Sequence, residues 1–228
     1  MKVKLLAHTP EPEKVISVAA RLCYSKISVE ELEEKLTEDK INSFLKKILE
    51  LGHESVLEHA SFTFAIEGIS RACSHQLVRH RIASYSQQSQ RYVNFDEIVF
   101  VKPDSITQNE ELSKKFDDFL KNIEDFYLEM IDNGVPAEDA RFILPNACMT
   151  KIIVSMNLRE LKHFFKLRCC NRAQWEIREL AIEMLKLLKN KIPLLFSQMG
   201  PACLNGPCPE GQMSCGKASE VRDFFKKL

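Results

Sequence analysis

The sequence predicts a single domain of the α+β class. Its 228 residues, 45% of them hydrophobic, are enough to bury one sizeable core. A few short segments have the apolar pattern of strands, whereas several longer ones place apolar residues three and four positions apart, as helices do. No internal repeat or low-complexity linker divides the chain before residue 198, so the domain is predicted to span residues 1–197.

Three segments are predicted to be strands. MKVKLLA at 1–7 and SFTFAIE at 61–67 alternate polar and apolar residues, and Gly68 is expected to end the second strand. The run IIVSMN at 152–157 has the composition of a short buried strand.

Seven segments are predicted to be helices. The first starts at Thr9-Pro10 and continues to about Cys23; two more start near residues 29 and 39, and Gly52 ends the later one. The segment 112–131 has the most regular apolar spacing and is closed by Asn133-Gly134. The remaining predicted helices cover 69–81, 158–170 and 175–191.

Residues 198–228 differ from the rest of the chain and are predicted to form a loop-like C-terminal tail. Glycine, proline and three cysteines, Cys203, Cys208 and Cys215, are concentrated there. The Cys-x4-Cys-x6-Cys spacing matches no zinc knuckle, and no histidine follows His163 to complete a ligand set. Free thiols on a mobile tail are therefore expected rather than a metal site.

The overall charge balance argues against a protein that coats nucleic acid. Thirty-two basic and 32 acidic side chains give a formal net charge of zero, whereas counterion release requires a basic excess. No signal peptide precedes the first helix, and no apolar stretch has the length of a membrane span, so a cytoplasmic protein is expected. Zero net charge also leaves oligomers unopposed by electrostatic repulsion.

The eight cysteines are expected to be reduced, because no secretory signal accompanies them. GHESVLEH at 52–59 contains two histidines, but His59 lies six residues after His53. Neither HExxH nor its inverted form fits this spacing, and the pair does not share one helical face. A helix cap or a positioning role is the better interpretation here, and no metal is predicted.

A dense cluster of hydrogen-bond donors begins at Arg79-His80-Arg81 and ends near Arg91-Tyr92. Serines and glutamines fill the segment between, and the next carboxylate along the chain is Asp96. Arginine provides a planar, permanently charged fork for phosphate or carboxylate oxygens, and hydroxyls and amides add neutral partners. The cluster predicts an anionic ligand, with a solvated charged face as the alternative.

A second arginine of interest is Arg168, at the end of the helix that carries LRCCNRAQWEIR. An ion pair with Glu176 or Glu179 is the plain structural interpretation. Cys169 and Cys170 are adjacent and so too close for an unstrained disulfide, which leaves a thiol nucleophile or simple packing open.

The segment RHRIASYSQQSQRY resembles the signature of flavin-dependent thymidylate synthases, an RHR followed after seven residues by serine, here Ser89. GHESVLEH, ARFILP around Arg141 and LRxxxxAQWEIR from Leu167 resemble the same family in the same order. The resemblance implies a mostly antiparallel central sheet flanked by helices and a homotetramer with flavin sites between subunits. It also implies reductive methylation of dUMP with methylenetetrahydrofolate as carbon donor and NADPH-reduced FAD as hydride source.

The same resemblance implies roles for individual residues. Arg168 would ionise and hold the uracil ring and is the predicted catalytic residue. The predicted flavin contacts are Ser55, Arg79, His80, Arg81, Gln87, Asn157, Leu158, Arg159 and His163. The predicted dUMP contacts are Gln76, Leu77, Val78, Arg79, Gln87, Gln88, Ser89, Gln90, Arg91, Arg141 and Arg168. No enzyme cysteine attacks the pyrimidine in this family, so Cys169 and Cys170 are expected to be packing residues.

Two positions depart from the family pattern. Ser86-Gln87 stands where the family often has Asn-Glu, so the amide of Gln87 cannot act as a carboxylate base. Arg172 stands where many members have histidine. The alternatives are a nucleotide- or RNA-binding module that uses the RHR loop and a structural protein held by metal on the cysteine tail. Few aromatic residues flank the loop for base stacking, which weighs against RNA.

Overall fold

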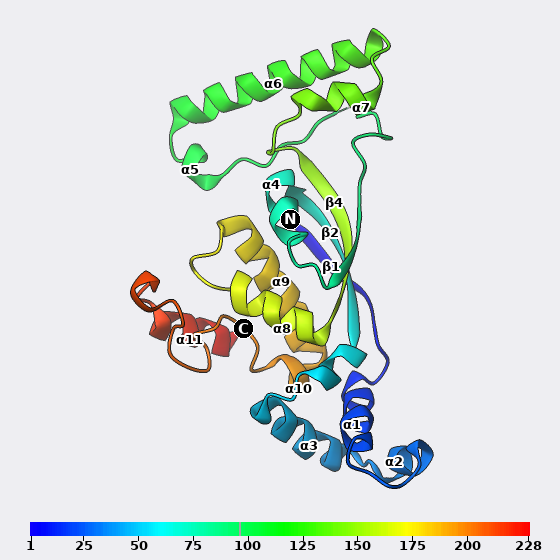
Figure 1. Cartoon of the computed structure of the whole chain (residues 1–228). Helices are drawn as coiled ribbons and strands as arrows, with labels where there is room; N and C mark the ends of the chain where they lie inside the picture. Colours follow the sequence, from blue (N-terminus) through cyan, green and yellow to red (C-terminus); the bar gives the residue numbers. More distant parts are fainter. Residues whose placement is uncertain (96) are drawn as a thin grey trace. The chain divides into compact units, whose positions relative to one another are not determined.

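Four strands form one antiparallel sheet in the order β1-β2-β4-β3 (Figure 1). The strands are β1 (Lys2–His8), β2 (Ser61–Ser70), β3 (Ala83–Gln87) and β4 (Met149–Asn157). Backbone bonds beyond the strand ends show the antiparallel register. The amide of Arg71, after β2, donates to the carbonyl of Cys148, before β4, at 2.9 Å. The amide of Leu158, after β4, donates to the carbonyl of Ala60, before β2, at 2.8 Å. The predicted α+β class with an antiparallel sheet is confirmed.

The computed structural model describes residues 1–95 and 97–228; Asp96, the first carboxylate after the basic cluster, lies outside them. The chain divides into two compact units. The first consists of Met1–Lys2, Ile66–Arg79 and Tyr85–Ile153, and the second of Val3–Ala65, His80–Ser84 and Val154–Leu228.

Strand β2 continues past Gly68, so the prediction that Gly68 ends it is wrong. Gly68 has a φ of +78° inside the strand, and a Cβ there would lie 3.3 Å from the Cα of Met1. The strand ends at Ser70, whose hydroxyl accepts a hydrogen bond from the amide of Cys73 at 3.0 Å. This cap starts α4 (Arg71–Leu77), which is shorter than the helix predicted over 69–81.

Strand β3 was not predicted, because its sequence ASYSQ is polar and gives almost no apolar alternation. It lies at the end of the strand order, where a strand needs only one neighbour. The amide of Gln88, just after β3, donates to the carbonyl of Lys151 at 3.0 Å. Strand β4 begins three residues before the predicted start at 152.

The first unit contains α4, α5 (Asp104–Thr107), α6 (Glu110–Asp132), α7 (Ala137–Ala140) and the 3-10 turn η2 (Arg141–Ile143). Figure 1 shows α6 running beside α7. A small core of Ile98, Tyr127, Ala140 and Cys148 holds this part together. Glu124 on α6 is buried and accepts a hydrogen bond from the amide of Ile98 at 2.8 Å.

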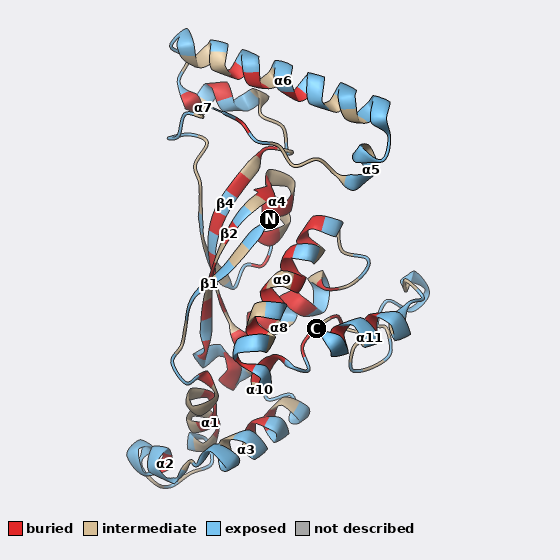
Figure 2. Cartoon of the chain, turned by 180° about the vertical axis from the view of Figure 1, so that it is seen from behind, coloured by how far each residue is buried: buried red, intermediate tan, exposed pale blue. Residues whose placement is uncertain are grey.

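The second unit contains the N-terminal helices and the pair α8–α9. Its elements are α1 (Pro12–Leu22), α2 (Val29–Lys35), α3 (Glu38–Leu51), η1 (Ser55–His59), α8 (Leu158–Arg168), α9 (Trp175–Lys191), α10 (Pro193–Phe196), η3 (Gly211–Met213) and α11 (Ala218–Lys227). Helices α8 and α9 carry the largest buried faces, including Phe164 and Phe165 (Figure 2). Helix α9 has the predicted bounds, and Gly52, with a φ of +72°, ends α3 as predicted.

Helix α1 begins at Pro12 rather than at the predicted Thr9-Pro10. Glu11 adopts a left-handed conformation with a φ of 44°, which separates α1 from the strand before it. The Thr9 hydroxyl does not cap the helix; it accepts a hydrogen bond from the amide of Ser61 at 2.9 Å. Thr9 therefore ties the end of β1 to the start of β2.

The C-terminal segment is not only loop, since residues 218–227 form α11. Val221 and Phe225 are buried four residues apart on one face of this helix. Arg222 donates to the carbonyls of Cys203 at 2.8 Å and Gly206 at 2.7 Å. Lys189 of α9 donates to the carbonyl of Phe225 at 2.6 Å, so α11 is fixed to the rest of its unit. Among the helices that the structure describes, none combines the length and apolar character needed to cross a membrane.

Candidate functional site

The predicted site residues are divided between the two units. Arg79 closes one segment of the first unit, and His80 opens a segment of the second. The first unit holds the predicted nucleotide residues Gln76, Leu77, Val78, Arg79, Gln87, Gln88, Ser89, Gln90, Arg91 and Arg141. The second holds Ser55, His80, Arg81, Asn157, Leu158, Arg159, His163 and Arg168.

In the second unit, His80 links Glu160 to Arg168. The imidazole is 5% exposed, and its Nδ1 lies 2.9 Å from Oε1 of Glu160, which is also buried. On the other side of the ring, Nε of Arg168 donates to Nε2 at 3.1 Å. The ring packs edge-on against Phe164 with centroids 5.0 Å apart.

These contacts define the protonation state of His80. A guanidinium only donates, so Nε2 must accept; Nδ1 then carries the proton and donates to Glu160. Burial lowers the pKa of His80 and is the largest cause, with the Glu160 hydrogen bond opposing it and the Arg168 charge adding to it. His80 is therefore a neutral imidazole that joins a carboxylate to an arginine.

The start of α8 presents the other predicted flavin residues in different ways. Asn157 caps the helix, its Oδ1 accepting a hydrogen bond from the amide of Glu160 at 2.9 Å. The side chain of Leu158 is fully buried, so only its backbone can face a ligand. Arg159 is half exposed and pairs with Glu58 and with Glu54, the latter at 3.7 Å. Ser55, on η1, and His163, on α8, are both exposed.

In the first unit, the glutamine at 87 is held by two hydroxyls. Its Nε2 donates to Oγ of Ser74 at 2.9 Å and to Oγ1 of Thr150 at 3.3 Å. These two hydrogen bonds hold the side-chain amide of Gln87 between α4 and β4. The neighbouring carbonyl of Gln88 accepts a hydrogen bond from Nη2 of Arg71 at 2.7 Å.

Arg91 and Arg141 both contact Glu138, and Ser89 shapes the turn that carries Arg91. The Ser89 hydroxyl accepts hydrogen bonds from the amides of Arg91 at 3.0 Å and Tyr92 at 3.3 Å, which shapes the turn. Nε of Arg91 lies 2.5 Å from Oε2 of Glu138, and Nε of Arg141 donates to the Glu138 carbonyl at 3.1 Å. The basic cluster, which contains no acidic residue between Arg79 and Tyr92, is thus paired with Glu138 in the folded chain.

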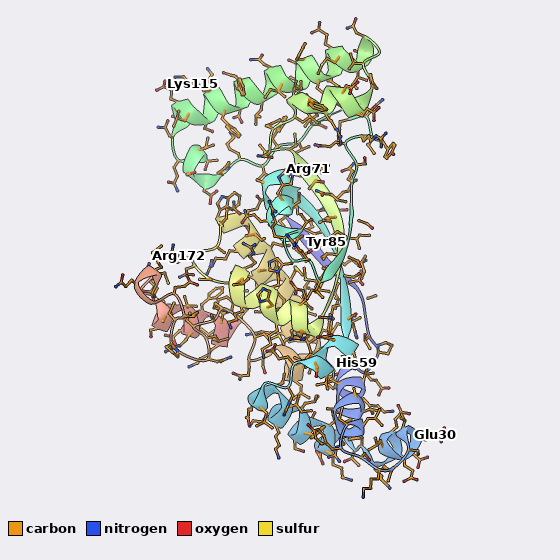
Figure 3. The ribbon with its side chains drawn as sticks, in the orientation of Figure 1. Glu30, His59, Arg71, Tyr85, Lys115 and Arg172 are labelled. Atoms are coloured by element: carbon orange, nitrogen blue, oxygen red, sulfur yellow. The ribbon has the colours of Figure 1, made fainter. Side chains whose placement is uncertain are left out.

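Arg71 is a nearby cation that the sequence reasoning missed, because it fell inside the predicted helix 69–81. Figure 3 labels it on α4. Its pKa is lowered first by burial, and the charge of Arg141 lowers it further. Arg71 therefore adds a further cation close to Arg141 in the first unit.

The remaining predicted nucleotide and flavin contacts vary in exposure. Leu77 is buried, and its carbonyl accepts a hydrogen bond from the hydroxyl of Tyr85 at 2.9 Å (Tyr85 is labelled in Figure 3). Gln76 and Gln90 are partly exposed, and Val78, Arg79 and Arg81 are exposed. Tyr85 therefore anchors the end of α4 immediately before the RHR.

The comparisons with known proteins decide the family. Residues 4–194 match the family described as thymidylate synthase complementing protein. A flavin-dependent thymidylate synthase of Geobacter sulfurreducens is 60% identical and covers 100% of this chain and 99% of its own length. Proteins of the same name from Clostridium tetani and Pyrococcus horikoshii are 51% and 48% identical over 97% and 98% of their lengths, matching 99% and 100% of this chain.

The chain belongs to the Thy1/ThyX family of flavin-dependent thymidylate synthases. A flavin cofactor goes with membership of this family. The donor set of the second unit suits such a cofactor, because Ser55, Arg159 and His163 are polar, exposed and carried by η1 and α8. Hydroxyl and guanidinium groups are suitable partners for the phosphates and ring edges of a flavin nucleotide.

In this member of the ThyX family, the cysteine beside Arg168 is not poised as a nucleophile. Cys169 is fully buried, and burial raises its pKa to about 12, so it stays a thiol at neutral pH. All eight cysteines are free. Within residues 1–95 and 97–228, no three histidine, cysteine or acidic side chains are arranged to hold a metal ion.

A hollow of about 1050 Å³ in the second unit lies apart from the predicted site residues. It is lined by α3, by Lys162 and Lys166 of α8, and by the segment from Leu194 to Asn205. None of the predicted flavin or nucleotide residues lines it. Among the described residues, the candidate chemistry is therefore marked by hydrogen-bond geometry rather than by this hollow.

Proposed function

We propose that this chain catalyses the reductive methylation of dUMP to dTMP, with methylenetetrahydrofolate as carbon donor and NADPH as reductant. The observation that carries the proposal is the full-length match, at 60% identity, to a flavin-dependent thymidylate synthase. The RHR at 79–81 and Ser89 fall inside the matched region.

The phosphate of dUMP would be held by the residues around Glu138. Arg91 and Arg141 supply permanent positive charge, and the Ser89 hydroxyl shapes the turn that carries Arg91. Bidentate arginine contacts give both affinity and geometry to a phosphate. Gln87, held by Ser74 and Thr150, would contribute a neutral amide to the nucleotide site.

Arg168 would bind the uracil ring. Negative charge develops on N3 and the neighbouring carbonyl oxygen when the ring is activated, and a guanidinium stabilises it through charge-assisted hydrogen bonds. Arg168 cannot act as an ordinary base, because its guanidinium stays protonated. Its Nε donates to Nε2 of His80, which fixes one edge of the guanidinium.

The bound flavin supplies the hydride that no amino-acid side chain can provide. Ser55, Asn157, Arg159 and His163 would hold it, together with Arg79 and Arg81 of the RHR. His80 and Leu158 would contribute backbone rather than side-chain contacts, since one ring is hydrogen-bonded at both nitrogens and the other side chain is buried.

Two further proposals rest on the family resemblance. The first is a homotetramer in which the flavin sites lie between subunits, and the second is a cytoplasmic location. Light scattering tests the first: a stable monomer that still bound flavin tightly would contradict it.

The function is tested by purifying the protein and measuring three things together. The preparation should be yellow with a flavin absorbance band, should bind dUMP, and should form dTMP only when methylenetetrahydrofolate and NADPH are both present. A colourless protein that bound RNA would instead support the alternative of an RNA-binding module. A yellow protein without dTMP formation would contradict the proposed reaction while leaving the cofactor in place.

A further inference from the structure

We propose that Glu160 is a positioning residue of this reaction, which acts through His80 to fix the orientation of Arg168. The inference rests on the proposed function, in which Arg168 binds the uracil. Glu160 is not among the predicted nucleotide or flavin contacts, and its role follows from the contacts of the second unit alone.

The direction of the hydrogen bonds in this chain of three residues is forced by chemistry. Arg168 only donates, so Nε2 of His80 accepts, Nδ1 carries the proton, and Glu160 must accept it. If the imidazole held its proton on Nε2, two N–H groups would face each other across the 3.1 Å between His80 and Arg168. Glu160 selects the tautomer that keeps Arg168 bound.

The side chains of Glu160, His80 and Arg168 are packed together on one side of α8. Glu160, Phe164 and Arg168 are spaced four residues apart on α8 and so share one helical face. His80 lies against this face, edge-on to Phe164 at 5.0 Å and to His163 at 5.8 Å. His80 and Glu160 are 5% and 6% exposed, so water does not compete for their bond.

The position of Glu160 in the first turn of α8 supports its role as an acceptor. Its amide is bound to Oδ1 of Asn157, and the amide groups of a helix start favour a negative charge nearby. The carboxylate of Glu160 and the guanidinium of Arg168, both on α8, are thus joined by the neutral imidazole of His80, which lies against this helix. This is the arrangement of a base-orienting triad, in which the carboxylate fixes the imidazole and the imidazole fixes the working group.

Fixing Nε limits the rotation of the guanidinium plane of Arg168. An arginine loses much rotamer entropy when it is immobilised. The contacts with His80 and Glu160 restrict Arg168 before the substrate binds, so less of this entropy is lost during binding. A preorganised donor acts on the charge that develops in the transition state more than on the ground state. Loss of Glu160 should therefore lower kcat more than it raises the KM for dUMP.

The central test uses Glu160→Gln, with Glu124→Gln as the matched control. Glu124 is also a buried carboxylate, but it belongs to the first unit, and the partners described for it, the amide of Ile98 and the ammonium of Lys121, are not predicted site residues. We expect Glu160→Gln to lower kcat about ten- to a hundredfold, as loss of an orienting carboxylate does elsewhere, with the dUMP KM changed less than about threefold. Flavin absorbance should be unchanged, and Glu124→Gln should retain the wild-type kcat.

A double-mutant cycle tests whether Glu160 acts through Arg168. In an Arg168→Ala background, Glu160→Gln should have almost no further effect on kcat, because the residue through which Glu160 is proposed to act is gone. Full additivity of the two losses would overturn the proposal. So would a Glu160→Gln enzyme with the wild-type kcat, or one in which only the KM rises.

A spectroscopic measurement on the wild-type protein keeps the proposal testable if Glu160→Gln does not fold. Nitrogen chemical shifts of the His80 ring should show a neutral imidazole protonated at Nδ1 at neutral pH. A proton on Nε2 would overturn the inference without touching the proposed function. Absence of dTMP formation by the wild-type enzyme would instead contradict the function, so the two failures are distinguishable.

Discussion

Arg91 and Glu138, 47 positions apart in the sequence, form a short ion pair with 2.5 Å between Nε and Oε2. The backbone carbonyl of the same glutamate binds Arg141 at 3.1 Å. Both arginines that are proposed to hold a phosphate therefore contact Glu138, Arg91 through its carboxylate and Arg141 through its backbone carbonyl. A phosphate that binds here must share Arg91 with Glu138 or displace it.

This competition gives a prediction for dUMP binding. Arg91→Ala should raise the Kd of dUMP at least about tenfold, since a charge-assisted phosphate contact contributes roughly 1.5–3 kcal/mol. Glu138→Gln should lower the Kd about two- to threefold, because removing a half-exposed partner releases less than about 1 kcal/mol. Calorimetric titration of dUMP into each variant, at two salt concentrations, measures these dissociation constants. An unchanged Kd in Arg91→Ala would remove Arg91 from the phosphate site.

For Arg168, the prediction separates charge from geometry. Arg168→Ala should lower turnover on the order of a hundredfold or more, as removal of an oxyanion donor does. Arg168→Lys should rescue only part of this loss, because lysine keeps the charge but loses the planar fork and the Nε bond to His80. Flavin absorbance, dUMP affinity and dTMP formation are measured together. Near-normal dTMP formation by Arg168→Ala would exclude Arg168 from the mechanism.

The cysteines next to Arg168 should be dispensable. Cys169→Ala and Cys170→Ala should each keep turnover within about threefold of wild type, equivalent to about 0.6 kcal/mol of activation energy. Cys169, with a pKa raised to about 12, should resist iodoacetamide at pH 8, whereas the exposed Cys23 should react. Mass spectrometry of labelled peptides measures this. A covalent pyrimidine adduct on either sulfur would reverse the conclusion.

Acid should destabilise the fold through His80. Its pKa is lowered from 6.5, so just below pH 6.5 the unfolded chain binds a proton that the folded chain does not. Folding stability then falls as pH falls from 6.5 toward the lower pKa of the folded state, by up to about 1.4 kcal/mol per pH unit. Melting temperatures between pH 7.5 and 5.5 should fall less in His80→Asn than in wild type. The exposed His53→Asn serves as control, and identical slopes in all three proteins would contradict the assignment.

The C-terminal helix provides a matched pair of aromatic residues. Phe225 is fully buried and its neighbour Phe224 is 46% exposed. Phe225→Ala should destabilise the protein by about 3 kcal/mol and lower Tm by roughly 6–12 °C. Phe224→Ala should change stability by less than about 1 kcal/mol. Equal effects would mean that α11 does not pack as described. Truncation after Ser197 would remove both residues at once, so it cannot replace this comparison.

Much of the fold could be predicted because long apolar periodicity needs no partner to be recognised. Helix α9 and the end of α3 at Gly52 follow directly from local pattern. Strand β3 could not be predicted in this way, because its five polar residues become a strand only through pairing with β4. Gly68 misled for a related reason: a local breaker was outweighed by the neighbours of a long strand.

The candidate site shows the same limit. The arginines and Ser89 were found from their density and from a family signature, both of which are local. Glu138 and Glu160 could not be found, because each works by meeting a residue tens of positions away in sequence. Neither lies in a recognisable motif, and a lone acidic residue on a helix is ordinarily a solvated one.

Asn157 occupies the point where β4 ends and α8 begins, and its single side-chain oxygen sets where the first turn of that helix starts. The position therefore requires a short side chain with an acceptor oxygen. Aspartate, serine or threonine could replace the acceptor, whereas an alanine would cost about 1 kcal/mol and loosen the turn that carries Glu160. Because about 1 kcal/mol is a small part of the stability of a folded domain, such a protein should stay folded while the orientation of Glu160 becomes less fixed.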